Sequence, residues 1–174
     1  MPRNASAALP VAYVVLRILI VLNWVYGAAI LALLSFTFVN EPFLLRALHL
    51  GSAAENPALV AGIRAIAVLG LVAVPLNYAL LKWLLAMVHT VRGGDPFVAA
   101  NAYRLQAIAW ILLALQLLSL VIWSIGKAIS TAAHPLHLDA GFSTSGWLAV
   151  VLTFVLARVF AEGTLMREDL EGTI

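Results

Sequence analysis

The chain has 174 residues and a mass of 18.6 kDa; 64% of its residues are hydrophobic and only 10% carry a charge. Soluble domains are roughly 45–50% apolar and about 25% charged, so this chain is too apolar to be an ordinary soluble domain. Ten basic and eight acidic residues leave a net charge of +2, with no basic run for direct binding of nucleic acid. The absence of cysteine excludes disulfides and thiolate metal sites. The composition therefore predicts an integral membrane protein.

Four long charge-free runs divide the chain. They cover residues 18–40, 65–81, 105–126 and 140–157. Each run has 17 to 23 residues, close to the roughly 20 that a helix needs to cross about 30 Å of hydrocarbon. None shows the period-two alternation of a membrane β-barrel strand. We therefore predict an all-α polytopic membrane protein, a bundle of four transmembrane helices.

We expect a single membrane domain over residues 1–174. Because Asp95-Pro96 is typical of a helix N-cap followed by proline in the first helical position, the third helix is expected to begin at residue 96. The predicted helices cover about 11–39, 58–91, 96–126 and 144–166. The predicted connections are outer loops at 40–57 and 127–143, an inner turn at 92–95 and a cytoplasmic tail at 167–174.

The distribution of lysine and arginine sets the expected orientation. With the N-terminus inside, seven of the ten basic residues fall on or near the inner side. The three on the outer side are Arg46, Arg64 and Lys127. The positive-inside rule then predicts that both termini are cytoplasmic.

Two segments on the expected inner side carry a family resemblance. One is Gly-Asp-Pro-Phe at 94–97, with Asn101, Arg104-Leu105 and Trp110 following at helical spacings. The other is Ala-Arg-Val-Phe-Ala-Glu-Gly at 157–163, which leads into Leu165, Arg167 and the Asp-Leu-Glu-Gly-Thr-Ile ending. Together with four spans in a chain of this length, they resemble a bacterial membrane family catalogued as domain of unknown function 2975.

The resemblance implies a location in the bacterial cytoplasmic (inner) membrane. Genes of this family often lie beside one for a small helix-turn-helix regulator of the Cro/repressor type, which implies that such a regulator is a candidate cytosolic partner. The resemblance supplies no catalytic residues.

The polar and aromatic residues near the inner span ends form a candidate partner-binding surface. They are Arg92, Asp95, Phe97, Asn101, Arg104, Arg158, Glu162 and Arg167. Arg158 and Glu162 lie four residues apart on one predicted helix, which is the spacing of an ion pair. The alternative interpretation is that these residues only fasten the helix ends at the interface.

Polar residues inside the spans form a second candidate site, a pocket lined by Asn23, Asn77, Gln106 and Gln116. Such a pocket would suit a small-molecule transporter or a ligand-binding bundle. The alternative interpretation is packing through interhelical hydrogen bonds, worth about 1 kcal/mol each. None of the four runs contains Asp, Glu, Lys, Arg or His, and this disfavours an ion-coupled transporter.

Neither catalysis nor a cofactor is expected. His134, His137 and Asp139 are of metal-ligating types, but their spacing matches no specific motif, so we predict a polar loop and no metal site. No nucleophile, base and stabiliser are spaced to converge. We therefore predict a non-enzymatic regulatory or sensing protein that contacts the lipid bilayer and docks a cytosolic partner. The alternatives are a transporter or ligand-binding bundle and a scaffold subunit of a membrane complex. Because four spans make a thin bundle, a homodimer is plausible.

Overall fold

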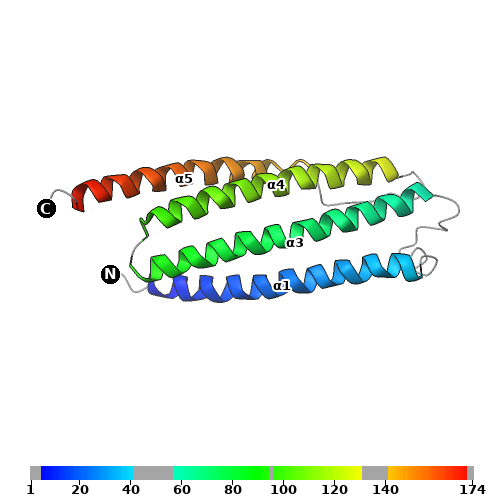
Figure 1. Ribbon diagram of the computed structural model, residues 1–174, viewed down its shortest axis with the longest axis horizontal. Coiled ribbons are helices and arrows are strands. Elements are labelled where there is room, and N and C mark those ends of the chain that lie inside the picture. The colour runs from blue at the N-terminus through cyan, green and yellow to red at the C-terminus, as the bar shows by residue number, and fades with distance from the viewer. Residues whose placement is uncertain (1–4, 41–56, 95, 131–140, 172–174) are drawn as a thin grey trace. The chain divides into compact units, whose positions relative to one another are not determined.

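The computed structural model describes residues 5–40, 57–94, 96–130 and 141–171, with side chains described from Leu9 to Arg167 within these ranges. The described residues form four long helices and no strand. The helices are α1 (Ala5–Val39), α3 (Pro57–Arg92), α4 (Ala99–Ile129) and α5 (Thr144–Glu171), as Figure 1 shows. All four are long and apolar enough to cross a membrane. The prediction of an all-α chain with four transmembrane helices is confirmed.

The helices are longer than the charge-free runs that they contain. The 36 residues of α3 would measure roughly 54 Å at about 1.5 Å per residue, against about 30 Å of hydrocarbon. The charge-free run of α5 stops at Ala157, and the helix continues to Glu171. About four turns of α5 therefore lie beyond its charge-free run. We call residues 158–171 the α5 arm.

The chain divides into two compact units. The first unit contains residues 1–23, 76–114 and 144–174, and the second contains residues 24–75 and 115–143. Helices α1, α3 and α4 contribute a segment to each unit, whereas α5 belongs to the first unit alone.

Within the second unit, the segments of α1 and α3 pack in antiparallel fashion. A Cβ atom added at Gly27 would lie 3.0 Å from Val74 Cγ1, and the α1 backbone therefore comes close to α3. At the end of α1, Arg64 Nη2 donates a hydrogen bond to the Thr37 carbonyl at 2.6 Å. The carbonyls of a last helical turn lack intrahelical partners, so Arg64 stabilises this end of α1.

Gly62 of α3 is buried against Ile129 of α4, and there is no space for a side chain between them. An added Cβ would lie 2.6 Å from Ile129 Cδ1. We expect Gly62→Ala to lower the free energy of unfolding in detergent by about 1–3 kcal/mol, because overpacking forces neighbours to shift. Adding Ile129→Ala should restore most of the loss. In Gly70→Ala the new Cβ would lie 3.3 Å from Ile30 Cδ1, and the loss should be smaller. If Gly62→Ala and Gly70→Ala lowered the free energy of unfolding equally, the packing argument would be contradicted.

Within the first unit, contacts between aromatic rings show which helices are neighbours. The Tyr13 and His89 rings join α1 to α3, with 5.4 Å between their centroids. An edge-to-face pair of Trp83 and Tyr103 joins α3 to α4. The pair of Trp110 and Phe154 joins α4 to α5. In this unit, α3 therefore contacts α1 and α4, and α4 contacts α3 and α5.

The start of α4 differs from the prediction. The helix begins at Ala99, three residues after Pro96, and residues 96–98 are not helical. The side chain of Asn101 donates from Nδ2 to the Pro96 carbonyl at 2.9 Å. This bond holds the Pro96 carbonyl outside the helical hydrogen-bonding pattern, which explains the later start. Asp95, the expected N-cap residue, lies outside the described residues.

Candidate functional site

A buried amide links helix ends within the first unit. Asn101 is 0% exposed. Its Nδ2 donates to Thr90 Oγ1 at 2.7 Å and to the Pro96 carbonyl at 2.9 Å. Its Oδ1 accepts a hydrogen bond from Arg104 Nη1 at 2.9 Å. One side chain therefore connects α3, the 96–98 segment and α4.

The partners of Asn101 extend this network to the α3 backbone. Thr90 Oγ1 donates to the Met87 carbonyl at 2.8 Å, and Arg104 Nη1 also approaches the Ala86 carbonyl at 3.4 Å. Buried polar groups are strongly destabilising when they lose their partners. Asn101 is therefore a positioning residue, and its buried side chain does not belong to an exposed docking surface. Arg104 is only half-buried and is oriented by it.

Phe97 links the start of α4 to the α5 arm. Its ring lies 5.2 Å from the Phe160 ring, measured between centroids, and it remains 43% exposed. A Cβ added at Gly163 would lie 3.2 Å from Phe97 Cδ1, so the ring rests directly on the α5 backbone. The contact between these two family-like segments was not predictable from either segment alone.

Arg158 and Glu162 form the ion pair that their spacing predicts. The distance from Arg158 Nε to Glu162 Oε1 is 2.8 Å, and the two side chains are 78% and 56% exposed. Exposed pairs four residues apart on a helix contribute only about 0.3–0.5 kcal/mol. Either residue can therefore exchange its partner for another charged group at little cost.

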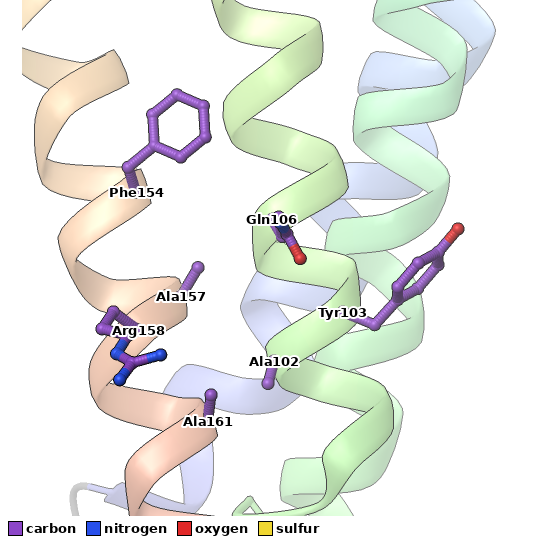
Figure 2. A pocket seen from close by; sticks show the side chains of 7 residues that line it. All are labelled: Ala102, Tyr103, Gln106, Phe154, Ala157, Arg158 and Ala161. Atoms are coloured by element: carbon purple, nitrogen blue, oxygen red, sulfur yellow. The ribbon is translucent and has the colours of Figure 1, made fainter.

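A groove lies between α4 and α5 beside this ion pair. It has a volume of about 310 Å³. It is lined by Ala102, Tyr103 and Gln106 of α4 and by Phe154, Ala157, Arg158 and Ala161 of α5. Figure 2 shows Gln106 on the α4 wall and Arg158 on the α5 wall, while the Tyr103 ring points away from α5. We call this cavity the α4/α5 groove.

A second hollow continues along the same two helices. It also has a volume of about 310 Å³ and is lined by Ala99, Ala102, Ala161, Thr164 and Leu165. Ala102 and Ala161 line both cavities. Small side chains on both walls allow another helix or chain to approach the backbones closely. Within the described part of the chain, Gln106 makes no hydrogen bond, so its amide is available to an occupant.

The residues of the predicted interior pocket are divided between the two units. Gln106 lines the α4/α5 groove, and Asn23, Asn77 and Gln116 do not. Gln116 belongs to the second unit, where its Nε2 donates to the Ser143 carbonyl at 3.4 Å. Asn23 and Asn77 belong to the first unit.

The remaining predicted residues divide between exposed positions and undescribed ones. Arg92 and Arg167 are exposed, at the end of α3 and on the α5 arm. His134, His137 and Asp139 lie outside the described residues. Sequence reasoning missed Tyr13 and Arg17; the Tyr13 ring lies beneath the guanidinium groups of both Arg17 and Arg92. Their four-residue spacing on α1 can be read from the sequence. The packing of α3 against this part of α1 cannot.

The fold and the groove together define a class: a multi-pass α-helical membrane protein with a small-residue groove beside its helix ends. The chain belongs to the family described as protein of unknown function (DUF2975), whose model matches residues 46–174. This match confirms the resemblance carried by residues 94–97 and 157–163. No curated protein and no solved structure matches the chain.

Proposed function

We propose that this chain is a non-enzymatic regulatory protein of the bacterial cytoplasmic membrane that docks a cytosolic partner in the α4/α5 groove. The observation that carries the proposal is the groove itself, with its alanine walls, the Gln106 amide that bonds to none of the described residues, and an exposed arginine. This combination suits an amphipathic helix, whose apolar face enters a groove while its polar edge contacts charged groups.

The position of the groove along the helices supports docking of a partner at the membrane surface. Gln106 lies two residues after Arg104, and Arg158 directly follows the charge-free run of α5. The groove is therefore near the boundary between hydrocarbon and water. The α5 arm extends beyond this boundary and adds surface for contact. An acidic residue of the partner would replace Glu162 as the partner of Arg158.

The orientation and the type of partner are parts of the same proposal. Lysine and arginine counting puts this end of the helices in the cytoplasm. The family resemblance supplies one candidate partner, a small helix-turn-helix regulator. Binding such a regulator at the membrane would couple a change in the helices to transcription, which defines the regulatory role proposed here.

The proposed topology makes a prediction that the cysteine-free sequence allows to be tested directly. Asn40 follows α1, and Met166 lies exposed on the α5 arm. In intact cells, we expect a membrane-impermeant maleimide to label Asn40→Cys. Labelling of Met166→Cys should require permeabilised membranes, and the unsubstituted chain is the control without thiols. Labelling of Met166→Cys in intact cells would contradict the proposed orientation.

Photo-crosslinking tests the docking proposal. Photoreactive residues would replace Ala102, which lines the α4/α5 groove, Leu165, which lines the second hollow, and Val151, an exposed position within the charge-free run of α5. We expect the same cytosolic protein to be captured from positions 102 and 165 and not from Val151. Adducts only to lipid or to a second copy of the chain would contradict the proposal.

One observation favours a second candidate function. The amide of Gln106 and the guanidinium of Arg158 lie on opposite walls of one groove, which would also suit a small amphiphilic ligand. In that case, the groove positions would capture a small molecule rather than a protein, and the adduct mass would distinguish the two functions.

A further inference from the structure

A cluster of cationic and aromatic groups surrounds Tyr13, away from the α4/α5 groove. The guanidinium carbon of Arg17 lies 5.1 Å from the centroid of the Tyr13 ring, and that of Arg92 lies 5.6 Å from it. The His89 ring meets Tyr13 edge to face, with 5.4 Å between the centroids. Four side chains from α1 and α3 therefore gather at one position in the first unit. We call them the Tyr13 cluster.

The Tyr13 cluster contains two positive charges and no described negative one. Among the side chains that the structure describes, the only carboxylate is Glu162, and it pairs with Arg158 on α5. Cation–π contact with Tyr13 stabilises each guanidinium but neutralises neither. Two cations beside one ring repel each other, and a bound anion would remove this cost.

The sequence position of the cluster, just before a charge-free run, predicts that it lies at the level of lipid headgroups. Arg17 is the last charged residue before the charge-free run of α1. Its guanidinium lies over Tyr13, one turn earlier, so the side chain extends away from the span. Arginines at helix ends direct their charge in this way toward the interface, where phosphates are abundant. Arg92 reaches the same ring from the end of α3.

We propose that the Tyr13 cluster binds the phosphate group of an anionic phospholipid headgroup. Each guanidinium carries five N–H donors in a planar fork suited to phosphate oxygens. The Tyr13 hydroxyl and the His89 imidazole add further donors. The acyl chains of the lipid would lie against the exposed apolar face of α1, which includes Val14 and Ile18. This site is independent of the proposed docking in the α4/α5 groove, because none of its residues lines that groove and its ligand is different.

The experiment measures lipid retention by native mass spectrometry of the full chain released from nanodiscs. The nanodiscs contain phosphatidylcholine mixed with phosphatidylglycerol, and the readout is the ratio of the two adducts. We expect the unsubstituted chain to retain phosphatidylglycerol preferentially. Arg17→Gln and Arg92→Gln should each lower the ratio about tenfold, because each removes a guanidinium that binds the phosphate through charge-assisted hydrogen bonds. The Arg17→Lys/Arg92→Lys variant preserves both charges and should keep most of the preference for phosphatidylglycerol. It also shows whether the chain still folds when both arginines are replaced.

Two further variants separate a built site from general surface charge. Lys82→Gln removes an exposed positive charge from α3 away from the Tyr13 ring, and it should leave the ratio unchanged. Asp95→Asn removes a carboxylate three residues after Arg92 in the sequence, and it should leave the ratio unchanged or raise it, because a carboxylate would compete with phosphate for a guanidinium. The proposal would be overturned if Lys82→Gln lowered the adduct ratio as much as Arg17→Gln, or if Asp95→Asn lowered it at all.

A last experiment distinguishes the phosphate of a lipid headgroup from free inorganic phosphate. Inorganic phosphate is added to the detergent-solubilised chain, and thermal unfolding is measured with chloride as the control anion. We expect phosphatidylglycerol, and not inorganic phosphate, to raise the unfolding temperature in an Arg17- and Arg92-dependent way. Stabilisation by inorganic phosphate without a lipid preference would overturn the headgroup assignment.

Discussion

Replacing Asn101 with leucine should lower the free energy of unfolding by about 3 kcal/mol, the largest stability effect that we predict for a single residue. The side chain is 0% exposed and bonds to Thr90, Arg104 and the Pro96 carbonyl. Leucine has a similar volume but no polar atoms, so these partners lose their bonds in the interior. An unsatisfied buried group costs about 1–3 kcal/mol, and more when it is charged.

The measurement is thermal unfolding of the purified chain in detergent, followed by circular dichroism. Thr90→Val removes one partner and should cost about 1 kcal/mol. Gln106→Leu changes the same type of amide on the same helix at an exposed position without a described hydrogen bond, and its effect should stay within about 0.5 kcal/mol. If Asn101→Leu were no more destabilising than Gln106→Leu, the network would not have the role assigned to it.

Asn101→Asp gives a more detailed test of the same network. A carboxylate retains the acceptor for Arg104 but loses the Nδ2 donor to Thr90 and Pro96. We expect a loss intermediate between those of Thr90→Val and Asn101→Leu. A gain in stability would mean that the pairing with Arg104 outweighs both lost bonds, and the two bonds from Nδ2 would then not be what stabilises this site.

The fold was predictable because the bilayer imposes a simple requirement. A charge-free run of about 20 residues can satisfy its backbone in hydrocarbon only as a helix. The four runs therefore indicated four spans. The bounds were harder to predict, since α1 starts at Ala5 and α4 at Ala99. Where α4 begins, the helix start is set by local hydrogen bonds such as that from Asn101 to the Pro96 carbonyl.

The candidate site was predictable only where it depends on spacing within one helix. The four-residue separation of Arg158 and Glu162 indicated their pair correctly. Asn101 is different, because its polarity suggested a surface role while the structure buries it completely. Its partner Thr90 lies on another helix, and no local pattern reveals that contact. The Tyr13 cluster was missed for the same reason, since it combines residues of α1 and α3.

Filling the α4/α5 groove should reduce partner capture about tenfold while leaving the helices folded. Ala161 lines both cavities from α5, and its small side chain leaves the space open. Ala161→Trp would place a large ring where we propose that a partner helix lies. The measurement is the adduct yield from a photoreactive residue at position 165, compared at equal expression. Loss of a central, well-packed contact of an interface commonly costs tenfold or more in affinity.

The matched control is Val155→Trp, which adds the same ring on the same helix at a position that is 54% exposed and does not line the groove. It should leave both the adduct yield and the unfolding temperature nearly unchanged. Arg158→Ala should reduce the yield less than Ala161→Trp, and Arg158→Lys should restore part of it, because the charge but not the planar fork remains. If Val155→Trp and Ala161→Trp reduced the yield equally, contact with the partner would not depend on the groove. The docking surface would then have to be sought on the α5 arm beyond it.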